Sequence, residues 1–177
     1  MGICDGRVAI VTGAGRGVGR AYALMLAAQG AKVVANDLGG SAAGDGADLS
    51  PAQEVVNEIK AAGGEAIVDG SDVSDWEQSK AMIQLAIDTF GGLDILINNA
   101  GILRDRMMVN MTEDDWDSVI KVHLKGTFAP CHHAANYWRT ESKAGRQRDA
   151  RIINTSSGSG LFGNIGQANY AAAKAGI

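Results

Sequence analysis

The sequence predicts a single α/β domain built on a doubly wound parallel sheet. Short apolar runs rich in β-branched residues have the length of buried strands, and they lie at 7–11, 31–36, 65–69, 93–98 and 151–155. Helical patterns fill 18–29, 51–62, 75–90, 113–139 and the chain from 168 onward. Strands that alternate with helices in this way form a parallel sheet with helices on both faces.

Residues that commonly begin and end helices mark the boundaries between these elements. Three polar residues are predicted N-caps: Ser50 followed by Pro51, Ser74 with Glu77, and Thr112 with Asp115. Glycines that end helices follow at Gly30, Gly63-Gly64 and Gly91-Gly92. Because no repeat or linker interrupts the alternation, residues 1–177 are predicted to form one domain.

The composition excludes several classes of protein. A net charge of −4 argues against nucleic acid as the main partner. No apolar run approaches the ~20 residues of a membrane span, and no secretory signal precedes the first strand. The two cysteines, Cys4 and Cys131, lie far apart in the sequence. We therefore expect a cytoplasmic protein with reduced thiols and no membrane partner.

A glycine-rich segment joins the first strand to the first helix. Residues 7–11 lead directly into Thr12-Gly13-Ala14-Gly15-Arg16-Gly17-Val18-Gly19. Such a turn lets the backbone approach a pyrophosphate, whose charge then meets the helix N-terminus. The Gly-x-x-x-Gly-x-Gly spacing differs from the more common dinucleotide fingerprint, and a loop without a ligand is the alternative. The strand–turn–helix context favours a dinucleotide.

A serine, a tyrosine and a lysine near the end of the chain form the second motif. Ser157 follows the last strand, Tyr170 comes thirteen residues later, and Lys174 lies one helical turn beyond Tyr170. Positions i and i+4 share a helix face, so the ammonium can lie beneath the phenol and favour its ionised form. Ser157 can then hydrogen-bond a carbonyl or hydroxyl oxygen. Alone, Tyr-x-x-x-Lys also fits an ordinary surface pair.

Together these motifs resemble the short-chain dehydrogenase/reductase family. The matching residues, in family order and spacing, are Thr12 to Gly19, Asp72-Val73, Asn98 to Gly101, Ser157, Tyr170 and Lys174. Residues 36–40, 101–106 and 163–170 are similar to the 3-hydroxyacyl-CoA dehydrogenase part of peroxisomal multifunctional enzymes and to its bacterial relatives. The resemblance covers essentially the whole chain and implies a Rossmann-type fold.

The resemblance also implies catalytic roles. Ser157 orients the substrate oxygen, Tyr170 transfers the proton, and Lys174 assists Tyr170 and holds the nicotinamide ribose. His123 stands where family members usually carry an asparagine that orders a water in the proton relay. It either holds the same water or merely packs. No metal site is expected, because the adjacent side chains of Cys131-His132-His133 point in different directions. The methionines Met107, Met108 and Met111 form either a substrate wall or part of the core.

The implied cofactor is NAD, with NADP as the alternative. The residues expected to bind it are Gly13, Arg16, Gly17, Val18, Gly19, Asp37, Asp72, Val73, Asn99, Ala100, Gly101, Tyr170 and Lys174. Asp37 ends the second strand, where a carboxylate accepts both ribose hydroxyls of NAD and repels a 2′-phosphate. Arg16 favours NADP, because an arginine in this loop often accompanies it in the family. We give Asp37 the greater weight.

The sequence thus predicts an oxidoreductase that interconverts a secondary alcohol and a ketone with NAD(H), on a 3-hydroxyacyl thioester or similar substrate. The alternatives are an NADPH-dependent 3-oxoacyl thioester (acyl-carrier-protein) reductase and a catalytically silent NAD-binding module. A homodimer or homotetramer is expected through helix 113–139 and the Tyr170 helix. Because family members usually continue with two more strands, we expect the domain to be C-terminally incomplete at residue 177.

Overall fold

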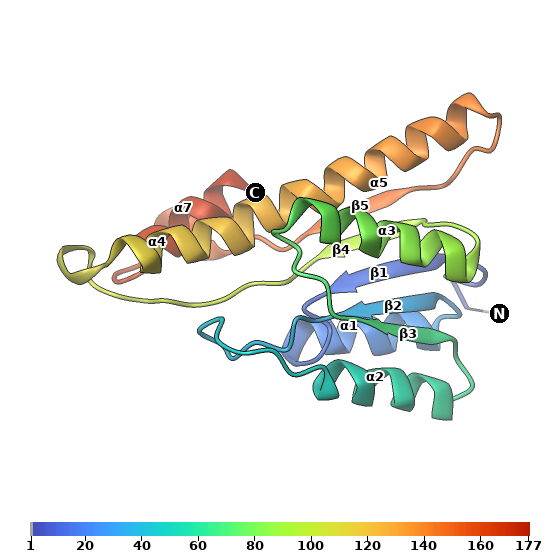
Figure 1. Ribbon diagram of the computed structural model, residues 1–177, viewed down its shortest axis with the longest axis horizontal. Helices are drawn as coiled ribbons and strands as arrows, with labels where there is room; N and C mark the ends of the chain where they lie inside the picture. The colour runs from blue at the N-terminus through green and yellow to red at the C-terminus, as the bar shows by residue number, and fades with distance from the viewer. Residues whose placement is uncertain (1) are drawn as a thin grey trace.

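A parallel sheet with helices on both faces forms the molecule, as the computed structural model of residues 2–177 shows (Figure 1). The strands lie in the order β3-β2-β1-β4-β5. Their bounds are β1 Val8–Thr12, β2 Lys32–Asn36, β3 Ala66–Asp69, β4 Ile95–Asn98 and β5 Arg151–Asn154. The five predicted strands and the doubly wound parallel sheet are confirmed.

The central strand β1 shows why the apolar runs are nearly continuous. All five of its residues are buried. Ala9 and Val11 pack against α1 (Gly17–Ala28) and α2 (Ser50–Ala61), whereas Val8 and Ile10 face α3 (Trp76–Phe90) and α5 (Gly126–Lys143). Successive strand side chains point to opposite faces, so a strand covered on both faces is apolar at every position.

The chain reverses its direction of travel across the sheet between β1 and β4. It moves outward from β1 to β2 and β3, and then returns to place β4 on the other side of β1. The crossovers on the two sides diverge at the carboxyl ends of β1 and β4, which leaves a crevice there. Ligands of open α/β sheets bind at such a switch point.

The predicted helix at 113–139 is not a single α-helix. Residues Glu113–Ile120 form α4, Lys121–Lys125 form a π-helical turn, η2, and α5 continues to Lys143. Pro130 lies inside α5 and has no N–H for the carbonyl four residues earlier. The carbonyl of Gly126 therefore lacks its usual helical hydrogen bond. The π-helical turn ends at Lys125, directly before Gly126, so it adjoins a position where the regular hydrogen-bond pattern of the helix is already interrupted.

The remaining elements include a short helix that the sequence reasoning missed. The structure adds η1 (Met108–Asn110), α6 (Gly158–Phe162) and α7 (Ala168–Gly176), of which α7 is the predicted Tyr170 helix. Ser157 caps α6, because its Oγ accepts a hydrogen bond from Ser159 N at 3.2 Å. A serine followed by glycines gave no periodic signal, so α6 was not predicted.

The three predicted N-caps had different outcomes. Thr112 and Asp115 form a capping box with two 3.1 Å hydrogen bonds, as predicted. Ser74 is not a cap, because the neighbouring Asp75 accepts the hydrogen bond from Gln78 N. The helix α2 begins at Ser50 itself, so the N-cap position falls on Leu49. Within residues 2–177, no helix is both long and apolar enough to cross a membrane.

Candidate active site

A cavity of about 340 Å³ lies at the switch point, beyond the carboxyl ends of β1, β2 and β4. Eight of the predicted cofactor residues line it: Gly13, Arg16, Asp37, Asp72, Val73, Asn99, Ala100 and Gly101. The other predicted residues, Gly17, Val18, Gly19, Tyr170 and Lys174, are not among those lining it. A cavity of this size and position is typical of a small-molecule site.

The glycine loop has the geometry that close approach to a ligand requires. Gly13 has φ +65°, and a Cβ there would lie 2.9 Å from Ala100 Cα. A Cβ at Gly19 would lie 2.0 Å from Gly13 O, so the loop packs too tightly for any other residue. Gly17 differs, because its Cβ would meet no atom within 4 Å. The loop is therefore closely packed on its inner side and open at Gly17.

The start of α1 suits a phosphate. Its N-cap, Arg16, makes no side-chain capping bond to the first helical turn. The backbone N–H groups of a first turn have no partner within the helix and carry the positive end of its dipole. An anion can take the place of the missing cap. The residues present thus fit the pyrophosphate of a dinucleotide.

Two carboxylates, those of Asp37 and Asp72, line the cavity. Asp37 accepts hydrogen bonds from Gly15 N and Gly39 N, both at 2.8 Å and on different oxygens. Each oxygen keeps a lone pair for a hydroxyl donor. Asp72 uses one oxygen to accept from Ser74 N and Ser74 Oγ, at 2.8 and 2.6 Å. Asp37 is therefore positioned to accept hydroxyl groups, and Arg16 lines the same cavity.

Tyr170 and Lys174 lie one turn apart on α7, as the sequence predicted. The Lys174 Nζ lies 5.6 Å from the centroid of the Tyr170 ring. Lys174 is 4% exposed, and burial lowers its pKa. Its ammonium donates a 2.5 Å hydrogen bond to Thr155 O, immediately beyond β5. This contact ties the lysine to the segment that leads into Ser157.

Ser157 reaches the same region through α6. The two helices are in close contact, because a Cβ at Gly160 would lie 2.7 Å from the Lys174 carbonyl carbon and the Ala175 nitrogen. Ser156 Oγ also donates to Lys174 O at 2.9 Å. Since Ser157 Oγ accepts its capping bond, its own O–H stays available to donate to a substrate oxygen.

His123 lies on η2 and contacts both Ile102, which lines the cavity, and Tyr170. Its Nε2 lies 3.0 Å from Ile102 N and 2.8 Å from Ile102 O, and its ring stands perpendicular to that of Tyr170 with centroids 5.1 Å apart. Burial lowers the pKa of His123 to about 4, and the Lys174 charge acts in the same direction. The ring is neutral at pH 7, and its buried Nδ1 has no partner within residues 2–177.

Thr12 and Asn169 lie in the quoted motifs, but their positioning roles were not predicted from the sequence. Thr12 Oγ1 accepts hydrogen bonds from Asn99 N and Ala100 N, at 2.9 and 3.1 Å. It thereby fixes the backbone of two residues that line the cavity. Asn169 is fully buried, and its Oδ1 accepts from Tyr170 N at 2.8 Å. A polar side chain beside a catalytic one was the available signal. His133 packs on Trp76, and residues 2–177 contain no group of three or more potential metal ligands.

Comparison with known proteins identifies the class. A family model described as short chain dehydrogenase matches residues 7–177. The chain therefore belongs to the short-chain dehydrogenase family. A crystal structure of a short chain dehydrogenase from Mycobacterium avium superimposes with a TM-score of 0.93 at 62% identity, covering 99% of this chain and 63% of that one.

Two curated relatives are similar over nearly the whole chain. The "Peroxisomal multifunctional enzyme type 2" of Drosophila melanogaster is 54% identical over 173 residues, 98% of this chain. The "Hydroxyacyl-CoA dehydrogenase ChsB1" of Mycobacterium tuberculosis is 48% identical over 179 residues, again 98% of this chain. The chain spans 27% of the first relative and 54% of the second.

Proposed function

We propose that this chain is an oxidoreductase that interconverts the secondary alcohol of a 3-hydroxyacyl thioester and the corresponding ketone, with NAD(H) as cofactor. The observation that carries the proposal is the meeting of Tyr170, Lys174 and His123, with α6 and its cap Ser157 packed on α7, at the carboxyl edge of the sheet that also holds the cavity. The similarity to the mycobacterial relative, a hydroxyacyl-CoA dehydrogenase, supports the substrate class.

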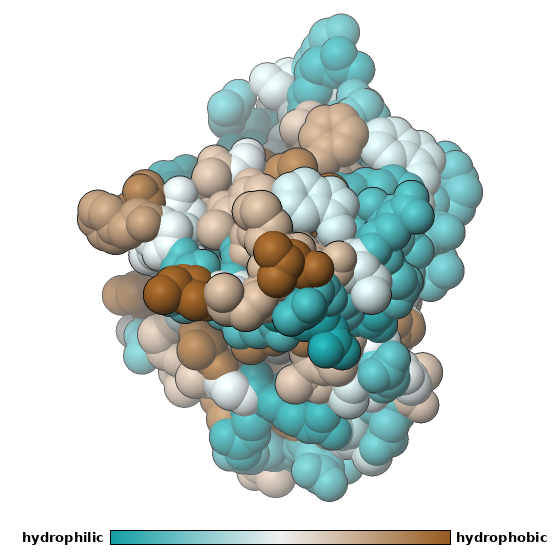
Figure 2. Space-filling model, turned by 90° about the vertical axis from the view of Figure 1, so that its left-hand side faces the viewer, coloured by the Kyte–Doolittle hydropathy of each residue, from teal (hydrophilic) through white to brown (hydrophobic). Residues whose placement is uncertain are grey.

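Exposed apolar side chains around η1 and α6 support the proposal of an acyl substrate. Figure 2 shows apolar side chains gathered on this face. Met107, Met108 and Val109 are 55, 73 and 90% exposed, and Leu161 and Phe162 are 76 and 88% exposed. The residue before Met107 lies beside the chain that follows α6, because Arg106 N donates to Gly166 O at 2.8 Å. Met107 and Met108 are not core residues, so the substrate-wall alternative is kept for them.

The chain's own residues divide the chemistry among them. The O–H of Ser157 donates to the substrate oxygen and holds it beside Tyr170. The phenol of Tyr170 takes up or returns the hydroxyl proton, and the Lys174 ammonium stabilises the phenolate. His123 and Gly101 shape the wall behind them, since a Cβ at Gly101 would lie 2.2 Å from the imidazole. The nicotinamide supplies the hydride chemistry when bound.

NAD is preferred to NADP in this proposal. The support is Asp37, whose carboxylate lines the cavity and would repel a 2′-phosphate. Arg16 lines the same cavity and favours the NADPH-dependent reductase as the second candidate. We also propose a homodimer or homotetramer, and the cytoplasmic location stays a prediction.

The decisive experiment replaces the proposed acid/base. Tyr170→Phe should lower the turnover of a 3-hydroxyacyl-CoA by more than about 100-fold while the dinucleotide Kd changes less than about twofold, because only the proton transfer is lost. Tyr22→Phe on α1 is the matched control and should leave both values unchanged. Turnover is followed by NADH absorbance and Kd by NADH fluorescence.

The outcomes of this experiment separate the alternatives. A Tyr170→Phe variant that keeps a tenth or more of the wild-type turnover would contradict the role of Tyr170. Wild-type protein that binds NADH but oxidises no 3-hydroxyacyl-CoA would favour the silent binding module. A wild-type preference for NADPH would favour the reductase.

A further inference from the structure

A long loop between β2 and α2 covers one side of the cavity. Residues 38, 40, 41, 42 and 44 of this loop line the cavity wall. Its tip, residues 41–46, folds on itself: Ser41 N donates to Asp45 O, and Ser41 Oγ accepts from Ala43 N and Asp45 N. These internal hydrogen bonds make the tip compact, and its position decides how tightly the cavity closes.

Every hydrogen bond and ion pair between the tip and the rest of residues 2–177 goes to two neighbouring residues. Leu103 N donates to Ala42 O at 2.9 Å, and Arg104 Nε donates to Ala43 O at 3.0 Å. An Arg104 Nη atom also pairs with Asp45 at 3.6 Å. The tip is therefore held over the cavity from one side, by a single short segment.

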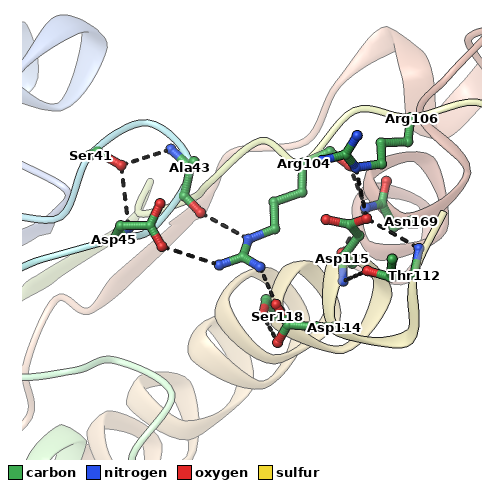
Figure 3. Close-up of polar contacts among 10 residues, drawn as sticks. All are labelled: Ser41, Ala43, Asp45, Arg104, Arg106, Thr112, Asp114, Asp115, Ser118 and Asn169. Carbon is green, nitrogen blue, oxygen red and sulfur yellow. Dashed lines mark hydrogen bonds and ion pairs between the residues drawn. The ribbon is translucent and has the colours of Figure 1, made fainter. Parts of the chain in front are cut away.

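Arg104 holds the tip from a fixed base. Its side chain is only 20% exposed, and the guanidinium lies between the tip and α4, where its other Nη pairs with Asp114 (Figure 3). Ser118 donates to the second oxygen of Asp114 at 3.3 Å. The wide planar fork of an arginine directs separate donors toward the Ala43 carbonyl and two carboxylates, whereas the compact ammonium of a lysine does not match this spread of acceptors.

The chain around Arg104 also holds the tyrosine helix. Three successive residues act on the start of α7: Arg104 O accepts from Asn169 Nδ2 at 3.0 Å, Asp105 accepts from Gln167 at 2.8 Å, and Arg106 N donates to Gly166 O. Asn169 in turn accepts from Tyr170 N. We call residues 102–106 the strap, because it joins the loop tip on one edge to the Tyr170 helix on the other.

We propose that Arg104 is a positioning residue that holds the loop tip 41–46 closed over the dinucleotide, and that the strap couples this closure to the Tyr170 helix. The proposal rests on the proposed function, because it assumes that the cavity takes a dinucleotide. It adds a residue that touches neither the reacting atoms nor the glycine loop. Closure of the cavity and placement of the acid/base are then two results of one set of contacts.

The first test measures dinucleotide affinity by NADH fluorescence. Arg104→Ala should raise the Kd by about tenfold, and Arg104→Lys should give an intermediate value. Arg151→Ala is the matched control: its side chain is 61% exposed, pairs with Asp149 and belongs to neither the tip nor the strap. It should change the Kd by less than about twofold. A purely structural role would lower the fraction of protein that binds and leave the Kd of that fraction unchanged.

A second variant keeps the test valid if Arg104→Ala fails to fold. The Asp45 side chain is 76% exposed, so Asp45→Arg should leave the fold intact and repel the Arg104 guanidinium. It should raise the Kd several-fold, whereas Ala47→Arg in the same loop should not. Added positive charge alone would strengthen the binding of an anionic dinucleotide, so the sign separates the two effects. An unchanged or lower Kd for Asp45→Arg would overturn the proposal.

Hydrogen exchange tests the coupling. In the wild-type protein NADH should slow exchange both in residues 41–46 and at the start of α7, and in Arg104→Ala or Asp45→Arg both effects should be weakened together. Protection at the start of α7 that stays at the wild-type level while the tip loses its protection would overturn the coupling. Wild-type protein that binds no NADH would instead contradict the proposed function itself.

Discussion

His123 illustrates how burial sets the chemistry of one side chain. It is 3% exposed, hydrogen-bonded to the backbone of Ile102 and close to the buried ammonium of Lys174. Each of burial and the Lys174 charge disfavours the imidazolium, which lowers the pKa to about 4. A neutral ring can hold Ile102 and pack on Tyr170 without placing a second charge beside the lysine.

This pKa makes stability depend on pH. The pKa of His123 is about 4 in the folded protein, against 6.5 for an unperturbed histidine, so below pH 6.5 the unfolded chain binds more protons. Its contribution to stability is constant above about pH 7 and falls as the pH drops toward 4. Between pH 7.5 and 5 the free energy of unfolding should fall by about 2 kcal/mol through His123 alone.

Urea unfolding of His123→Asn at the two pH values measures this contribution, because the variant should lose most of the pH dependence. His133→Asn is the comparison: burial also lowers the pKa of His133, but that ring is less buried. The carboxylates of Asp115 and Glu141, whose pKa values lie below the ordinary ones because of hydrogen bonds to Thr112 and Arg146, titrate below this window. Equal pH dependence in wild type and His123→Asn would contradict the assignment.

Asp37 is the residue that should decide between the two dinucleotides. Replacing it with serine removes the charge that repels a 2′-phosphate and leaves Arg16 on the same cavity. Asp37→Ser should therefore shift the ratio of kcat/KM values by about tenfold or more toward NADP. Steady-state kinetics with both cofactors give the ratio, and Asp88→Ser on the exposed face of α3 is the control, because Asp88 does not line the cavity. An unchanged ratio would remove Asp37 from the proposal.

At the scale of elements, the glycine loop must pack closely against the fold and also leave space for a ligand. At Gly19 the constraint is packing, because a Cβ would lie 2.0 Å from Gly13 O. At Gly17 the backbone has φ +53°, which L side chains rarely adopt, but the space beside it is open. Gly19 therefore serves the fold, and Gly17 leaves room for the proposed ligand.

The two alanine variants should separate these roles. Gly19→Ala should lower the free energy of unfolding by about 2 to 3 kcal/mol through overpacking. Gly17→Ala should cost about 1 kcal/mol through backbone strain, yet weaken NADH binding by about tenfold or more, because its methyl group occupies the open space. Urea denaturation and NADH titration of both variants measure the two quantities. Equal losses of stability, with NADH binding retained in Gly17→Ala, would contradict this division.

The π-helical turn shows an element adapting to a site. An uninterrupted α-helix from 113 onward was the simplest interpretation of the sequence, and the capping box at Thr112 supports its beginning. The widened turn at residues 121–125 contains the buried His123 that contacts Ile102. Such turns often occur at functional sites.

At the scale of the whole molecule, large apolar side chains remain exposed on the layer formed by α4 and α5. Trp116 is 41% exposed and Phe128 is 58% exposed, whereas Val119 on the same helical stretch is fully buried. Val119 packs inward, so the apolar spacing of this stretch serves both the core and an outer face. The outer face is where the proposed oligomer would form.

Self-association should depend on this face. Phe128→Lys should weaken the oligomer by about tenfold or more in sedimentation velocity at micromolar concentration, since it places a charge in an apolar interface. Met25→Lys is the matched control, because Met25 is 52% exposed on α1, in the opposite layer. A wild-type monomer, or equal effects of the two variants, would contradict an interface on α5.

The local features of this protein follow from its sequence. Apolar runs located the five strands because a parallel strand is buried on both faces. The glycine spacing located the loop, because the positive φ at Gly13 and the close contacts at Gly13 and Gly19 exclude side chains. The Tyr170 and Lys174 pair followed from the helical repeat. These are short-range constraints, which a chain expresses in consecutive residues.

Only the tertiary structure decided which distant residues meet. His123 contacts Ile102, and Arg104 pairs with both Asp45 and Asp114. Asn169 hydrogen-bonds both Tyr170 N and the strap. The polar partners of Arg104 and Asn169 have no spacing rule, because loops fix their positions rather than a helical or strand repeat. Which of many arginines and asparagines becomes buried and paired depends on the packing of the whole chain. The sequence thus determined the strands, the glycine loop and the tyrosine–lysine pair, and the packed fold determined the contacts that hold them in place.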